Sequence, residues 1–234
     1  MNGDRRVRLL IRQAADVPTG DDAWLAPAER AELARFRIDK RRNEWRLGRW
    51  TAKHLLATEL RLDSDPTTLA RIEVQAANDG APEPWLDAKP LDIPLSISHS
   101  AGTATAATAD AGTALGCDIE LIRALRRGTV ERHFTVAERS LLEDIEPHDW
   151  AVRGTMIWTA KESALKALRE GLRIDTCAVE VATSFDGPAG AWRAASITHL
   201  PDGRVFHGWW RRLGDYILSV AADPPSGPPD ELRS

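Results

Sequence analysis

Two long helical segments, each followed by a run of short strands, restrict the folds open to this chain. Apolar residues recur at helical spacing from about 43 to 60 and again from about 150 to 169. Strands are predicted after each helix, at 93–98, 103–109 and 114–122 and then at 178–185, 192–199, 205–212 and 215–222. Because the Asp110-Ala-Gly-Thr113 tetrad is typical of a hairpin turn, the first three strands are predicted to form a β-meander.

The length and composition are those of an ordinary globular protein. The 234 residues can form one domain with a sizeable core or two small ones, and 43% of them are hydrophobic and 28% charged. The two cysteines, Cys117 and Cys177, do not make a disulfide framework, and we expect both to be small buried apolar side chains. The proline-rich polar segment 224–234 predicts a disordered tail.

Charge and hydropathy exclude several classes of function. The formal net charge of -4 argues against general nucleic-acid binding, which needs a basic surface. The start of the chain lacks the apolar core of a signal peptide, and no apolar run reaches the roughly 18 residues that span a bilayer. We therefore expect a cytoplasmic protein that binds neither nucleic acid nor a membrane.

The strand predicted at 114–122 carries two carboxylates. Side chains alternate along a strand, so Asp118 and Glu120 share one face, and the other face is apolar. One interpretation is a half-buried strand that shows its polar side to water. The other is a cation site, because two carboxylates on one strand face repel each other and a hard cation such as Mg²⁺ would compensate them.

The segment Trp158-Thr-Ala-Lys-Glu-Ser-Ala-Leu-Lys166 places Glu162 and Lys166 one helical turn apart. One interpretation is an ordinary ion pair on an amphipathic helix. In the other, Glu162 is a third metal ligand or a general base, and Lys166 binds a phosphate. His99, in the segment Ser96-Ile-Ser-His-Ser100, could donate to a phosphate or simply be packed. Most arginines between 35 and 53 are interpreted as a solvated face, with two or three available for a polyanionic ligand.

Three blocks in this order, Ser96–Ser100, Gly116–Glu120 and Trp158–Lys166, resemble the 4′-phosphopantetheinyl transferases, and most of all the monomeric surfactin-synthetase-activating type. The resemblance extends from about residue 26 to 222. It implies an α+β fold of two similar halves, each with a long helix on a small antiparallel sheet. Residues 1–110 would form the half that binds the adenine and 3′-phosphate of coenzyme A, and residues 111–223 the metal-binding, catalytic half.

The resemblance also implies a reaction and a site. Such an enzyme transfers the phosphopantetheine of coenzyme A to a serine of an apo acyl or peptidyl carrier protein and releases adenosine 3′,5′-bisphosphate. Mg²⁺ would be held by Asp118, Glu120 and Glu162. Glu162 would also accept the serine proton, directly or through a metal-bound water, and Lys166 would offset charge on the pyrophosphate. Ser98 and His99 would contact the 3′-phosphate, while Gly80 and Pro82 would pass the adenine.

The chain departs from this family in its cations. Its adenine loop reads Gly80-Ala-Pro82, without the usual lysine or arginine, and two customary lysines correspond to Glu29 and Glu32. By location, the 3′-phosphate would then fall to one or more of three cations in the helix at 43–60, namely Arg46, Arg49 and Lys53.

Other expectations and alternatives also remain. We expect the carrier protein to dock near 129–142. One alternative is a non-catalytic protein of the same fold that binds coenzyme A or a carrier protein. Another, a nucleic-acid module using residues 35–53, is disfavoured by the net charge and the acidic residues.

Overall fold

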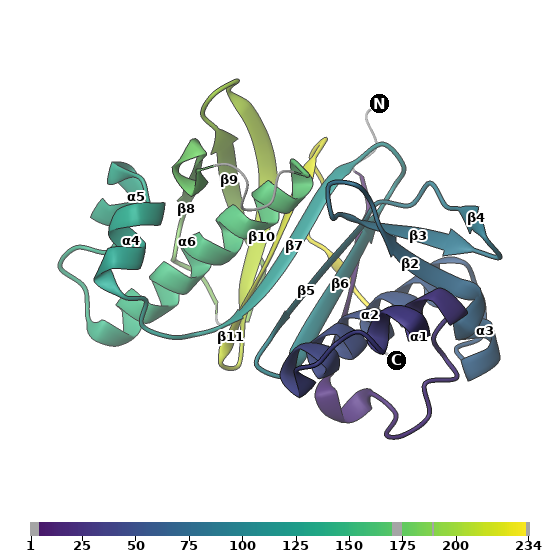
Figure 1. Cartoon of the computed structure of the whole chain (residues 1–234). Helices are drawn as coiled ribbons and strands as arrows, with labels where there is room; N and C mark the ends of the chain where they lie inside the picture. Colours follow the sequence, from purple (N-terminus) through teal and green to yellow (C-terminus); the bar gives the residue numbers. More distant parts are fainter. Residues whose placement is uncertain (1–4, 170–174, 189, 233–234) are drawn as a thin grey trace.

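The computed structural model describes residues 5–169, 175–188 and 190–232 and shows a mixed α+β fold, as expected (Figure 1). Its strands form three sheets, in which hydrogen-bonded neighbours follow one another in a fixed order. The four-stranded sheet has the order β12 (Asp230–Glu231), β1 (Val7–Gln13), β6 (Thr103–Ala109) and β5 (Leu95–Ser100). The five-stranded sheet has the order β7 (Ala114–Leu121), β11 (Tyr216–Asp223), β10 (Arg204–Leu213), β9 (Arg193–His199) and β8 (Val179–Thr183). The small sheet has the order β2 (Ile72–Ala76), β3 (Pro82–Leu86) and β4 (Lys89–Pro90).

Six α-helices lie in the described part of the chain. Two of them are 21 residues long, α2 (Asp39–Glu59) and α6 (Pro147–Ala167). The shorter ones are α1 (Pro27–Leu33), α3 (Pro66–Arg71), α4 (Arg127–His133) and α5 (Val136–Ser140), and there are two 3₁₀ turns, η1 (Ala14–Asp16) and η3 (Thr176–Ala178). The described helices include none long and apolar enough to cross a membrane.

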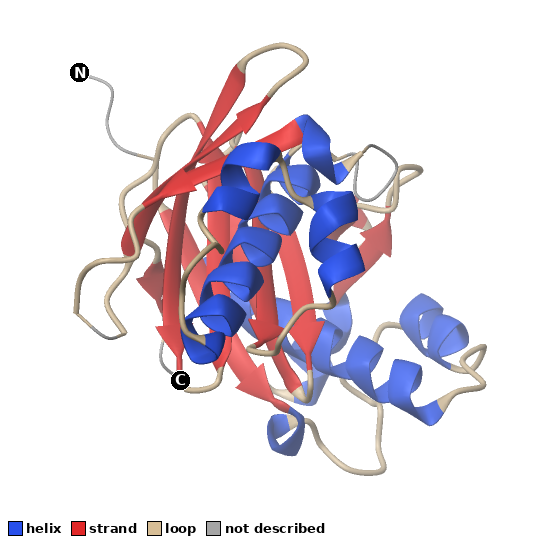
Figure 2. Ribbon diagram, turned by 90° about the vertical axis from the view of Figure 1, so that its left-hand side faces the viewer, coloured by secondary structure: helices blue, strands red, loops and turns tan. Residues whose placement is uncertain are grey.

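The two long helices cover different sheets. Helix α2 packs on β1, β5 and β6, and α6 packs on β7 and β11. A third apolar cluster joins the sheets, because Leu9 of β1 packs with Cys117 and Ile119 of β7. In Figure 1 the two sheets therefore lie between α6 and α2, and Figure 2 shows a long helix lying along the strands of its sheet. Cys117 is buried as expected, whereas Cys177 in η3 is only partly buried.

Each long helix carries a fully buried lysine paired with a buried glutamate, Lys53 with Glu29 and Lys161 with Glu138. Both lysines stand at the same position of their helix. Each glutamate caps the short helix in which it lies. Each also accepts a backbone hydrogen bond from a strand: Glu29 from Val74 of β2, and Glu138 from Val181 of β8. The same polar unit thus ties a short helix, a long helix and a strand together on each side of the molecule.

The structure corrects the expectation of a disordered tail at 224–234, as far as residue 232. Strand β12 pairs in parallel with β1, and the Leu232 amide donates to the Leu9 carbonyl at 2.8 Å. The indole of Trp209 in β10 donates to the Ser226 carbonyl at 3.0 Å. The tail is ordered because it hydrogen-bonds the edge of β1 and buries part of its own apolar surface, which its composition alone does not reveal.

The buried ring of His54 predicts loss of stability in mild acid. Burial, followed by the charge of Arg12, lowers the pKa of His54 to about 4, and its Nε2 atom has no partner among the described residues. Between pH 6.5 and 4 the unfolded chain binds a proton that the folded chain refuses, so the free energy of unfolding falls as the pH falls.

We expect His54→Phe to flatten this pH dependence in urea unfolding measured at several values between pH 7.5 and 5. The matched control His207→Phe, at an exposed position of β10, should keep the wild-type slope. Equal slopes for wild type and His54→Phe would contradict the prediction.

Candidate active site

The acidic face of β7 is covered by α6, so the first interpretation of β7, as a strand that shows its polar side to water, is wrong. Asp118 is only 4% exposed. Gly116, on the same face, lies against the backbone of α6 at Ser163. Strand β5 flanks β7 on the side away from β11, at the seam between the two sheets. Asp118 therefore lies buried between α6 and β5, whereas the Glu120 side chain stays 21% exposed.

Asp118 is held by a serine and a lysine from two different elements. Ser98 of β5 donates to its Oδ1 atom at 2.5 Å, and Lys166 of α6 donates to the same atom at 2.8 Å. Lys166 also donates to the carbonyl of Cys117 at 3.0 Å. Burial lowers the pKa of Lys166, but the charge and hydrogen bond of Asp118 together with the charges of Cys117 and Glu162 outweigh it, and the net shift is upward. The lysine is thus a fixed cation that binds Asp118 across the α6–β7 contact.

The other two carboxylates share the electrostatic field of Asp118. Glu120 accepts a hydrogen bond from Ser100 at 2.7 Å, and burial raises its pKa. The pKa of Glu162 is raised to about 7, first by burial and then by the negative charge of Asp118, with a smaller contribution from Glu120 and an opposing one from Lys166. The structure therefore brings all three predicted carboxylates and the predicted lysine into one neighbourhood.

The residues fit a hard divalent cation by their donor chemistry. All three carboxylates supply oxygen, the ligand that Mg²⁺ prefers, and the buried Oδ2 atom of Asp118 has no partner among the described residues. Within that part of the chain, no three such side chains are already gathered in a metal-binding group. A site for a cation is thus indicated by excess negative charge and an unused oxygen atom, rather than by a formed coordination shell.

Close packing at Gly116 sets the distance between β7 and α6. A Cβ atom on Gly116 would lie 1.8 Å from the Ser163 carbonyl oxygen and 2.8 Å from the Ala167 amide nitrogen. We expect Gly116→Ala to push the helix outward, to cost about 1–3 kcal/mol of stability and to reduce any activity that needs Asp118 beside Glu162. Chemical denaturation and an activity assay check this. Gly128→Ala is the control, because nothing lies within 4 Å of its Cβ position. Unchanged stability and activity would show that α6 need not approach β7 so closely.

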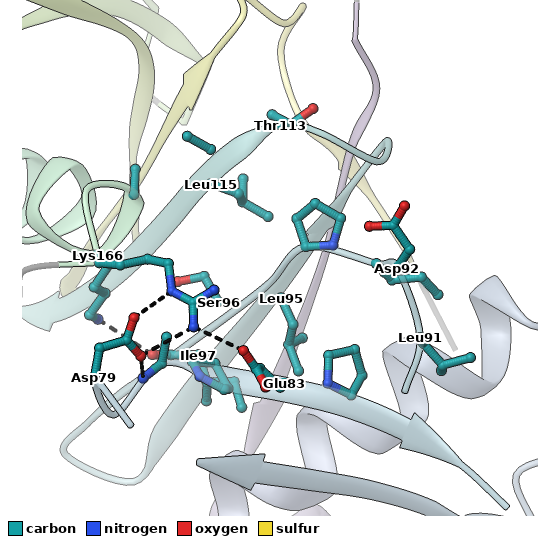
Figure 3. Close-up of a pocket in the computed structure, with 18 of the residues that line it drawn as sticks. Asp79, Glu83, Leu91, Asp92, Leu95, Ser96, Ile97, Thr113, Leu115 and Lys166 are labelled. Atoms are coloured by element: carbon teal, nitrogen blue, oxygen red, sulfur yellow. Dashed lines mark hydrogen bonds and ion pairs between the residues drawn. The ribbon is translucent and has the colours of Figure 1, made fainter. Parts of the chain in front are cut away.

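A cavity of about 750 Å³ opens beside Lys166 (Figure 3). Its walls come from β3, β5, the start of β7 and the end of α6. The predicted loop residues Gly80 and Pro82 line it together with Lys166. The structure thus places these two residues close to the predicted catalytic lysine, although they are more than 80 positions away in sequence.

The other residues predicted to contact coenzyme A differ in their exposure and in their partners. His99 is exposed, and its Cδ2 atom lies 3.8 Å from the Cβ position of Gly48 in α2. Ser98 is buried and its hydroxyl is used by Asp118. The assignment of Lys53 to a ligand is wrong, because its fully buried ammonium is paired with Glu29 and donates to a backbone carbonyl at 3.0 Å.

Two further cations predicted as ligand contacts are already paired within the fold. Arg46 pairs with Asp22 at 2.7 Å and Arg49 lies 3.7 Å from Glu29. Both side chains are largely buried. Helical spacing showed that Arg46, Arg49 and Lys53 share a flank but not that the flank faces protein.

Sequence reasoning missed the role of the serines in β5. Ser96 accepts from the Cys117 amide at 2.9 Å, Ser98 donates to Asp118 and Ser100 donates to Glu120. Their alternation at every second residue matches the alternation of Asp118 and Glu120 and is the signal that would have found them. The serines hold β5 beside β7 and orient the two carboxylates.

Comparison with known proteins gives one result for this region. Residues 114–221 match the family model described as the 4′-phosphopantetheinyl transferase superfamily. No curated protein matches the chain. The matched segment runs from β7 into β11 and contains Asp118, Glu120, Glu162 and Lys166. It supports a transferase of this superfamily, and it bears out the resemblance stated from the sequence over residues 114–221, which are less than half of the chain.

Proposed function

We propose that this protein transfers the 4′-phosphopantetheine group of coenzyme A to a serine of an apo acyl or peptidyl carrier protein and depends on Mg²⁺. The observation that carries the proposal is the convergence of Asp118, Glu120 and Glu162 beside Lys166, inside the segment that matches the superfamily. Burial, followed by the negative charge of Asp118, raises the pKa of Glu162 to about 7, so the site disfavours a further uncompensated negative charge. A cation relieves that charge and a pyrophosphate supplies the remaining ligands.

The residues of the chain have distinct tasks in this reaction. Asp118, Glu120 and Glu162 would hold the magnesium ion, which when bound neutralises charge on the pyrophosphate. Lys166, fixed by Asp118, presents a second positive charge to the same phosphates. Glu162 would also accept the proton of the attacking serine hydroxyl. The serine oxygen forms a bond to the β-phosphorus, the bond to the bridging oxygen breaks, and adenosine 3′,5′-bisphosphate leaves.

The cavity and the start of α2 supply a place for the nucleotide. The cavity beside Gly80, Pro82 and Lys166 would hold the adenine side of coenzyme A. The 3′-phosphate would lie near His99. Since Gly48 adjoins His99, helical spacing puts Arg41 two turns earlier on the same flank of α2, where it is exposed. Arg41 therefore replaces Lys53 as the proposed phosphate contact.

The finer architecture is part of the proposal. The matching ion pairs Lys53–Glu29 and Lys161–Glu138 support two similar halves, 1–110 and 111–223, joined in a monomeric pseudo-dimer. The carrier protein would dock near α4 and α5, where a groove of about 630 Å³ is lined by Val130, Leu142 and Trp150.

Intact-mass measurement tests the activity. Purified protein with Mg²⁺ and coenzyme A is expected to add about 340 Da to an apo carrier protein. Carriers of the fatty-acid, polyketide and peptide-synthetase classes should be tried in parallel, since the sequence does not select among them. No mass gain on any of the three classes would contradict the proposal.

The alternative is a non-catalytic protein of this fold that binds coenzyme A or a carrier. It is favoured by one observation, that no metal-binding group is already formed among the described residues. Calorimetry separates the two: the transferase should bind coenzyme A more tightly with Mg²⁺ present. Binding that ignores Mg²⁺, together with no mass gain, would favour the alternative.

A further inference from the structure

Arg169 connects the end of α6 to a loop near the start of β3. Its Nε donates to Asp79 Oδ2 at 2.6 Å and its Nη2 donates to Asp79 Oδ1 at 3.2 Å, so the contact is bidentate. The same Nη2 donates to Glu83 at 3.0 Å. All three residues line the cavity that also contains Lys166 (Figure 3). We call this group the Arg169 clasp.

The clasp holds both ends of the loop that contains Gly80 and Pro82. Asp79 Oδ1 also accepts the Ala81 amide at 3.0 Å, and the turn is closed by the Gly80 amide, which donates to Ala77 at 2.8 Å. Hydrogen bonds from Arg169, followed by the one from the Ala81 amide, lower the pKa of Asp79 to about 2. The conformation of this wall of the cavity therefore depends on a residue that is 90 positions away.

Backbone geometry and exposure indicate what the clasp does. Arg169 has a φ of +60°, a conformation that costs energy in a residue with a Cβ atom and persists where other contacts hold it. Its side chain is 50% exposed, and ion pairs at that exposure contribute little to overall stability. The clasp is thus suited to position a loop rather than to hold the fold together.

We propose that Arg169 is a positioning residue, which fixes the loop 79–83 against the end of α6 and so shapes the cavity for its ligand. The identity of that ligand as coenzyme A rests on the proposed function. Arg169 lies three residues beyond Lys166 in the chain. The end of α6 therefore carries the lysine, and Arg169 just beyond it holds the loop 79–83, which lines the same cavity. Loss of the clasp should weaken ligand binding far more than it slows the chemical step.

Hydrogen exchange tests the clasp without any ligand. In Arg169→Met, amide exchange across 77–83 is expected to accelerate about tenfold, because the charge-assisted bidentate bonds are lost. Arg169→Lys should fall between this variant and the wild type, since it keeps the charge and loses the fork. Arg71→Met is a matched control: it removes a bidentate pair of similar exposure with Asp87, which joins the end of α3 to the turn after β3 and lies outside the cavity. It should leave exchange across 77–83 unchanged.

Steady-state kinetics with coenzyme A test the consequence. We expect Arg169→Met to raise KM for coenzyme A about tenfold and to change kcat less than about twofold. Unchanged exchange would overturn the clasp even if transfer occurs. Faster exchange with an unchanged KM would overturn its role in binding. If the wild type transfers nothing to any carrier but exchange responds as expected, the proposed function fails and the clasp stands.

Discussion

Asp118→Asn is expected to lower phosphopantetheine transfer by at least about a hundredfold, since removing one preorganised electrostatic group from a site of this kind costs 10²–10³ in rate. The substitution keeps the shape of the side chain and a carbonyl oxygen for Ser98, but it removes the charge that fixes Lys166. It also removes one of the carboxylates expected to hold Mg²⁺. Product formation by intact mass, measured over a range of Mg²⁺ concentrations, checks the prediction.

Folding should be much less affected by Asp118→Asn. The variant loses an attraction to Lys166 but also a repulsion that raises the pKa of Glu162, and these effects oppose each other. We expect the free energy of unfolding to change by no more than about 1 kcal/mol. Asp63→Asn is the control, because Asp63 is exposed and lies outside both the cavity and the three-carboxylate group. Asp118→Asn with more than a tenth of wild-type activity would contradict the assignment of Asp118 to the site.

Lys161→Met should destabilise the protein by about 3–5 kcal/mol, the cost of removing one partner from a buried ion pair. The Lys161 ammonium pairs with Glu138 at 2.7 Å and donates to the carbonyls of Thr176 and Val179 at 3.0 and 2.5 Å. The variant removes the ammonium from all three partners, and the fully buried Glu138 carboxylate is left with backbone amide donors but without its countercharge. Urea unfolding at pH 7 measures the effect.

Two comparison variants make the Lys161 prediction specific. Lys40→Met removes a lysine that is 82% exposed and should change stability by less than about 0.5 kcal/mol. The double variant Lys161→Met/Glu138→Gln should lose less than the sum of the two single variants, because the unpaired carboxylate is gone. Strict additivity would show that the two groups do not depend on each other.

The long elements and the acidic residues were predictable because their signals are local. Apolar residues at helical spacing located α2 and α6 within a few residues, and alternation located β7. Glu162 and Lys166 lie on one helix, so their proximity follows from the helical repeat alone. Short helices were less predictable, because a helix of five residues such as α5 is too short to show a helical period.

Errors arose wherever burial depended on contacts between distant segments. The flank shared by Arg46, Arg49 and Lys53 was visible in the sequence, but only packing shows that Lys53 is enclosed with Glu29. The tail at 224–232 reads as polar and proline-rich, and it is ordered because β1 offers it an edge. One of the two interpretations of β7 put Asp118 at the surface, and α6 covers it.

The residues proposed to carry the chemistry can be found from the amino-acid sequence alone, since periodicity and spacing place carboxylates and lysine on particular faces of one strand and one helix. How those faces meet is visible only in the folded chain. Gly116 admits the backbone of α6, the serines of β5 hold the carboxylates, and Arg169 binds the loop at Asp79. These contacts join segments that are about 20 to 90 residues apart in the chain. Such contacts depend on how separate elements pack together, and no local pattern in the chain records them.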